Sequence, residues 1–199
     1  MPRRLSLLAA LVLVGALSAG CSDDVAPAVR IGDETITTEQ LLDEVAEWAG
    51  SPTLAEQLGI SAVRGAGKGS YDSSFVGFLL TNRISFEIHN AQFRKLDLTL
   101  TTAETDDVRN GLFPDAAASA AVFEELSKAY GDRLVDDVAR QFAVSQAMGD
   151  EYDAWRVEAL SAGDIEVNPK YGSWDATSGQ LVPPEGPRPA PGAEGFAEL

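Results

Sequence analysis

Side chains that could carry out chemistry are few among the 199 residues: the chain has one cysteine, Cys21, and one histidine, His89. A disulfide needs two thiols, and a structural zinc site needs several Cys or His ligands, so the sequence predicts neither. His89 follows an apolar stretch and precedes Asn90, and no Ser or Cys nucleophile can be assigned to it. We therefore interpret His89 as a partly buried, hydrogen-bonded imidazole.

Carboxylates are plentiful, and several are adjacent in the sequence, such as Asp106-Asp107 and Glu124-Glu125. Adjacent residues on a helix point in different directions, so these pairs are poorly suited to acid–base work. The sequence predicts no catalytic residue, no metal site and no small-molecule substrate. An enzyme of a type that these patterns do not show is an alternative that the sequence leaves open.

Cys21 has a distinctive context. Leu17-Ser18-Ala19-Gly20 precede it, Leu5–Leu17 is almost entirely apolar, and Arg3 and Arg4 stand near the start of the chain. This order resembles a bacterial lipoprotein signal peptide ending in a lipobox. The resemblance implies that residues 1–20 are removed and that Cys21 carries a covalent diacylglycerol and acyl lipid such as palmitate. The cofactor prediction is therefore this lipid alone.

Lipidation predicts an extracytoplasmic protein that is anchored to the cell membrane, because two or more acyl chains give durable anchoring. An uncleaved anchor or an ordinary signal peptide is the alternative. The pair Arg3-Arg4 also leaves the choice between the general and the twin-arginine export routes open.

The net charge is strongly negative. It is −16 for the whole chain and becomes −18 when Arg3 and Arg4 leave with the signal peptide. Nucleic acids and bare anionic lipids bind to positive surfaces, so neither is expected as a partner. Unfolded basic polypeptides would be attracted, although the charge can also serve solubility alone.

The pattern of apolar residues predicts a mainly α fold with a small β hairpin or sheet formed near the two ends of the domain. Strand, turn and strand are expected over 29–36, and a helix capped by Thr37 and Gln40 is expected to end at Gly50. Further helices are expected over 51–58, 71–96, 101–112 and 116–130, the last one ended by Gly131.

The longest helix is expected over 133–162, capped by Asp132 and ended by Gly163. Its acids, Asp137 among them, are interpreted as a solvated face. Residues 165–174 return to the period of a strand, and 180–182 could fold back on them. The expected domains are a signal peptide (1–20), a spacer (21–27), one folded domain (28–182) and a disordered tail rich in Pro and Gly (183–199).

The ordered set of elements resembles the SurA/PrsA family of exported chaperones, and specifically the SurA N-terminal domain. Val29-Arg30-Ile31-Gly32-Asp33-Glu34-Thr35-Ile36-Thr37 is similar to the strand, turn and helix start of that family. Leu100-Thr101-Thr102-Ala103-Glu104 is similar to a Thr-rich helix start, and Asp164–Pro169 to its closing strand. The segment Asn168–Trp174 looks like the ending of exported SurA-like lipoproteins. The resemblance covers residues 28–182.

We do not expect the family's parvulin domain, which isomerises X–Pro bonds, because the segment between Leu112 and Arg133 has room for one helix only and His89 is the only histidine. The resemblance therefore implies a non-catalytic chaperone that binds unfolded or newly exported polypeptides in an apolar groove. The alternatives are an adaptor lipoprotein that binds one folded envelope partner, or a foldase with a residual prolyl isomerase role. Six aromatic residues are candidates for the groove lining, and any of them can equally belong to the core: Trp48, Phe75, Phe78, Phe142, Tyr152 and Trp155.

Overall fold

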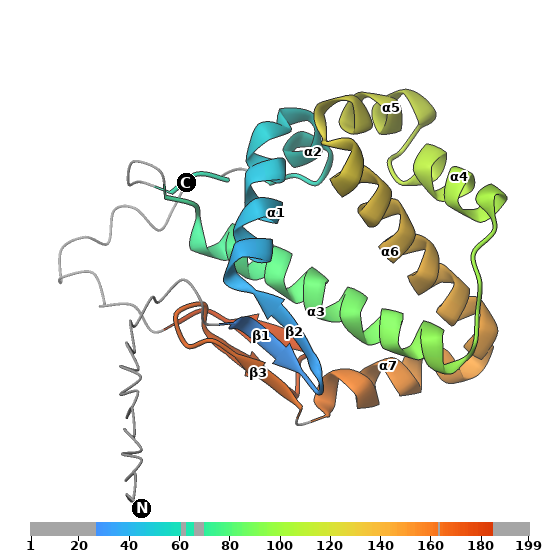
Figure 1. Ribbon diagram of the computed structural model, residues 1–199. Coiled ribbons are helices and arrows are strands. Elements are labelled where there is room, and N and C mark those ends of the chain that lie inside the picture. The colour runs from blue at the N-terminus through green and yellow to red at the C-terminus, as the bar shows by residue number, and fades with distance from the viewer. Residues whose placement is uncertain (1–26, 61–62, 66–69, 163, 185–199) are drawn as a thin grey trace, which may run out of the picture.

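A computed structural model of the chain describes residues 27–60, 63–65, 70–162 and 164–184 (Figure 1). The expected signal peptide, Cys21, most of the spacer, and residues 185–199 of the expected tail lie outside the described residues. The described part is mainly helical, with small antiparallel sheets built from the segments near its two ends, which confirms the predicted fold class. None of its helices is long and apolar enough to cross a membrane.

The larger sheet joins the two ends of the domain. It has the order β2-β1-β3, formed by β1 (Pro27–Ile31), β2 (Glu34–Thr37) and β3 (Ile165–Val167). Both pairings are antiparallel, with Val29 opposite Ile36 on one side and Val167 on the other. The second sheet is the hairpin of β4 (Ser173–Asp175) and β5 (Gln180–Val182).

Two short helices follow the first hairpin. Thr37 caps α1 (Thr38–Gly50): its hydroxyl accepts from the Gln40 backbone, and the Gln40 side chain accepts from the Thr37 backbone. Ser51 then ends α1 and caps α2 (Pro52–Gln57), which has Pro at its first position. Both caps lie where the sequence predicted them. A cap of this kind satisfies backbone N–H groups that have no partner within the helix.

The central element is α3 (Ser73–Lys95), which Asp72 caps. It contacts α1, α6, α7 and the strands β1 and β5, and its side chains Leu79, Leu80 and Ile84 are fully buried. In Figure 1 the larger sheet and α7 lie below α3, while α6, α4 and α5 lie above it. The next helix, α4 (Thr102–Gly111), begins at the predicted capping box of Thr101 and Glu104.

The predicted boundary at Gly131 and Asp132 is wrong. Helix α5 (Ala116–Glu125) ends earlier, and α6 (Lys128–Met148) begins with Ser127 as its cap. The backbone at Leu126 is extended, and the Ser127 hydroxyl accepts from the backbone of Tyr130. Gly131 lies inside α6, where an added Cβ would stand 3.1 Å from the Phe123 ring. This glycine permits close packing instead of ending a helix.

The predicted helix over 133–162 is divided. Helix α6 ends at Met148, a 3-10 turn η2 (Gly149–Glu151) follows, and α7 (Tyr152–Ser161) begins. Gly149 has φ of +53°, a left-handed conformation that glycine adopts without the steric cost of a side chain. The break lets α7 turn back and pack against α3, as Figure 1 shows.

Candidate binding groove

A cavity of about 270 Å³ lies between α1, α2, α3 and α6, and we call it the aromatic cavity. Parts of its wall are open to solvent, since Leu58 is 46% exposed and Phe78 is 41% exposed. Glu44, Asn82 and Tyr130 supply its polar groups. Its apolar wall includes Trp48, Leu54, Phe78, Phe86, Leu134 and Val138.

A second cavity of about 310 Å³ lies between α4 and α6, and we call it the α4–α6 cavity. Its apolar residues include Val108 and Phe142, and the carboxylates of Glu104 and Asp107 belong to the same wall. Leu112, at the end of α4, lines both cavities, so they adjoin one another, and residues of α6 line both of them. We refer to the two cavities together as the groove.

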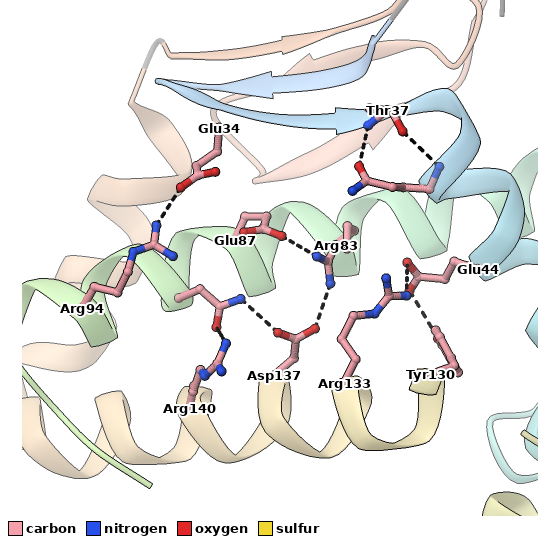
Figure 2. Close-up of polar contacts among 12 residues, drawn as sticks. Glu34, Thr37, Glu44, Arg83, Glu87, Arg94, Tyr130, Arg133, Asp137 and Arg140 are labelled. Carbon is pink, nitrogen blue, oxygen red and sulfur yellow. Dashed lines mark hydrogen bonds and ion pairs between the residues drawn. The ribbon is translucent and has the colours of Figure 1, made fainter. Parts of the chain in front are cut away.

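An ion pair and hydrogen bonds join α3 to α6. The Arg83 guanidinium donates to the Asp137 carboxylate at 2.8 Å and to the Glu87 carboxylate at 2.5 Å. Asp137 also accepts from the Asn90 amide at 2.9 Å, and the Asn90 oxygen accepts from Arg140. Figure 2 shows Arg83 of α3 and Asp137 of α6 pointing toward one another between the two helices. Only 5% of the Asp137 side chain is exposed, so the interpretation of this acid as solvated is wrong.

A hydrogen-bonded chain connects the ion pairs of α6 to the aromatic wall. The Trp48 indole N–H donates to the Tyr130 hydroxyl, which donates to Glu44, and Glu44 also accepts from Arg133 at 3.3 Å. Burial raises the pKa of Glu44, and the charge of Arg133 opposes that rise. Burial and the neighbouring Glu44 raise the pKa of Tyr130, so its hydroxyl remains a donor. The chain fixes the orientation of the Trp48 ring.

His89 belongs to a different place, the contact between α3 and α7. Its Nδ1–H donates to the Ser85 carbonyl at 2.7 Å, because a carbonyl can only accept, and Nε2 accepts from the Tyr152 hydroxyl at 2.9 Å. The Trp155 ring packs edge-on at 5.2 Å. Burial lowers the pKa of His89, which favours the neutral imidazole. The prediction of a hydrogen-bonded imidazole is confirmed, but His89 is fully buried and not partly buried as expected, with 1% of its surface exposed.

The six aromatic candidates are divided among three places. Trp48 packs against Phe75 at 5.7 Å and Phe78 at 5.8 Å between ring centroids. Trp48 and Phe75 are buried, whereas Phe78 is exposed at the aromatic cavity. Phe142, 56% exposed, lines the α4–α6 cavity. Tyr152 and Trp155 surround His89 and line neither cavity.

Sequence reasoning missed most of the groove wall, including Phe86, Leu112, Leu134 and Val138 as lining residues. A signal exists in α3 and α6, where an apolar set at helical spacing lies one residue away from a polar set at the same spacing. In α3 the apolar set is Phe78 and Phe86, with the polar cavity residue Asn82 between them, and the polar set beside it is Arg83 and Glu87. In α6 the apolar set is Leu134 and Val138, beside Arg133 and Asp137. Residues three or four apart lie on one face of a helix. Each of the two helices therefore turns its apolar set toward the groove and its polar set toward the charged side chains of another helix.

Comparison with protein-family models, with curated proteins and with solved structures finds no match for this chain. Within the described residues, no group of three or more His, Cys, Asp or Glu side chains is arranged to hold a metal ion.

Proposed function

We propose that the protein is a membrane-anchored, extracytoplasmic lipoprotein whose SurA-like domain binds unfolded or newly exported polypeptides without catalysing a reaction. The observation that supports this proposal most is the solvent-exposed apolar groove, with Phe78 and Phe142 accessible in adjacent cavities. Exposed apolar surface of this kind is typical of binding sites. The lipid at Cys21 is part of the proposal and rests on the sequence alone.

The concave form of the surface favours an extended client over a single folded partner. A groove between helices can accept successive side chains of an extended segment, whereas an adaptor is expected to present one flat patch to its partner. The two cavities share Leu112, so together they resemble a groove for successive side chains more than one flat patch.

Suppression of aggregation tests the proposal. The mature domain, added at near-stoichiometric ratio, should reduce light scattering by several unrelated proteins as they aggregate after dilution from denaturant. The double variant Phe78→Ser/Phe142→Ser should lose most of this effect. Both side chains are exposed, so their loss is expected to leave the fold intact, which circular dichroism can check.

A matched control removes exposed apolar groups outside the groove. Leu42 is 43% exposed and Val157 is 60% exposed, and neither lines a cavity of the groove. Leu42→Ser/Val157→Ser should suppress aggregation as well as the unchanged protein does. Failure of the unchanged protein to protect any client would contradict the proposal, and equal loss in both double variants would contradict the placement of the site.

A further inference from the structure

The two cavities of the groove differ in chemistry. The aromatic cavity is walled mainly by apolar side chains, and its one carboxylate, Glu44, is already bonded to Arg133 and Tyr130. The α4–α6 cavity has Glu104 and Asp107 beside its apolar residues. No Lys or Arg occurs among the described residues that line either cavity.

The two carboxylates of the α4–α6 cavity are free to receive a cation. Hydrogen bonds from Thr101 lower the pKa of Glu104, and both go to Oε2, which leaves Oε1 available. Asp107 is exposed, and its side chain forms no hydrogen bond or ion pair with any residue that the structure describes. Arg109, on the same helix α4, pairs with Asp132, and Arg140 on α6 pairs with Asp136.

Helix α6 lines both cavities, so the distance between them can be measured along this helix. The α6 residues that line the aromatic cavity are centred on Leu134, and those that line the α4–α6 cavity are centred near Phe142, eight residues further along the helix. At 1.5 Å per residue this separation is about 12 Å. An extended polypeptide advances about 3.3 Å per residue, so about four residues of a client would span it.

We propose that the groove selects extended segments in which an apolar or aromatic side chain lies about four residues from a Lys or Arg. The apolar side chain enters the aromatic cavity, and the cation lies against Glu104 and Asp107. This inference rests on the proposed function and adds the class of client. Charge complementarity supports it, since a carboxylate pair with no opposing cation attracts positive side chains. The attraction is between exposed groups and weakens as salt screens it.

Fluorescence anisotropy with labelled peptides tests the inference. Three peptides share a polar, flexible sequence and one Phe, and carry Lys, Gln or Glu four residues from that Phe; a fourth keeps Lys and replaces Phe by Ser. At low salt the Phe/Lys peptide should bind about fivefold tighter than the Phe/Gln peptide and tighter still than the Phe/Glu peptide. The preference should shrink at 0.5 M salt, and the Ser/Lys peptide should bind weakest.

Two double variants, each of which removes two negative charges, test whether the preference for Lys arises at the α4–α6 cavity. In Glu104→Gln/Asp107→Asn the preference for Lys over Gln should disappear, while affinity for the Phe/Gln peptide stays. Gln at position 104 can keep the capping box, as Gln40 does in α1. The control Glu39→Gln/Asp43→Asn removes two exposed acids from α1 outside both cavities and should retain the preference.

The outcomes separate the inference from the proposed function. Equal affinity for the Phe/Lys and Phe/Gln peptides, or equal loss of preference in the two double variants, would overturn the inference and leave client binding in place. Failure of every peptide containing Phe to bind would contradict the proposed function itself, and the inference with it.

Discussion

Replacement of Arg83 should destabilise the protein more than replacement of its partner Asp137. Arg83 lies between two carboxylates, those of Asp137 and Glu87, and the side chains of Arg83 and Glu87 are each 15% exposed. Arg83→Met therefore leaves two largely buried negative charges without their cation. Asp137→Leu leaves Arg83 with Glu87, so one ion pair survives.

The expected magnitudes follow from the cost of breaking buried ion pairs, which is about 3–5 kcal/mol when one partner is removed. Arg83→Met should lie at the upper end, about 5 kcal/mol, and Asp137→Leu at the lower end, about 3 kcal/mol. The exposed pair of Arg94 and Glu34, with side chains 58% and 53% exposed, supplies a control. Arg94→Met should cost less than about 1 kcal/mol.

Urea unfolding followed by circular dichroism measures these differences. With a slope of about 2 kcal/mol per M, the midpoint should fall by about 2.5 M for Arg83→Met, about 1.5 M for Asp137→Leu and less than about 0.5 M for Arg94→Met. If Arg83→Met does not fold, Arg83→Lys tests the geometry of the contact instead: it keeps the charge without the planar fork that can bond both acids, so it should lower the midpoint by less than about 2.5 M but by more than Arg94→Met does. Equal losses for the Arg83 and Asp137 variants, or a larger loss for Asp137→Leu, would refute the reasoning.

Three further results are expected. Tyr130→Phe should lower the free energy of unfolding by about 1–3 kcal/mol in urea titrations, because it deprives the Trp48 indole of its buried acceptor; an unchanged midpoint would contradict the hydrogen-bonded chain. The pKa of His89 is lowered in the folded state, so the unfolded chain takes up its proton first and stability should decline as pH falls below 6.5; His89→Gln should flatten that decline, by up to about 1.4 kcal/mol per pH unit. Cys21→Ala should release the protein from the membrane fraction with an unchanged unfolding midpoint; its retention in that fraction would contradict the lipobox.

Local signals predicted several helix starts correctly, because each depends on a few adjacent residues, but the cap predicted at Asp132 was wrong, since α6 begins with Ser127 as its cap. The capping boxes at Thr37 and Thr101 and the cap of α2 at Ser51 all occur where the spacing indicated. Glycine was harder to interpret, since it can end a helix or allow close packing within one. Gly131 does the second, against Phe123, and only the tertiary contact distinguishes the two cases.

The groove could be predicted only in part. Trp48, Phe78 and Phe142 do line it, but Phe75, Tyr152 and Trp155 do not, because an apolar side chain has the same pattern in a core as at an open wall. The burial of Asp137 was not predictable from α6 alone, since its partners Arg83 and Asn90 lie on α3. A charge on a helix becomes a buried ion pair only when another element supplies its partner.

The ion pairs and the groove depend on one another physically. Apolar walls such as those of Phe86 and Val138 would gain free energy by closing on each other and excluding water. Closing requires α3 and α6 to slide or rotate, and that movement would separate Arg83 from Asp137, at the cost of a buried, uncompensated charge. On both helices the polar set lies one residue away from the apolar set. A rotation that brings the apolar walls together would therefore break the ion pair between Arg83 and Asp137. On this reasoning the buried pair opposes closure of the groove, and if the groove binds clients as proposed, Asp137→Leu should narrow it and weaken that binding even at temperatures where the domain stays folded.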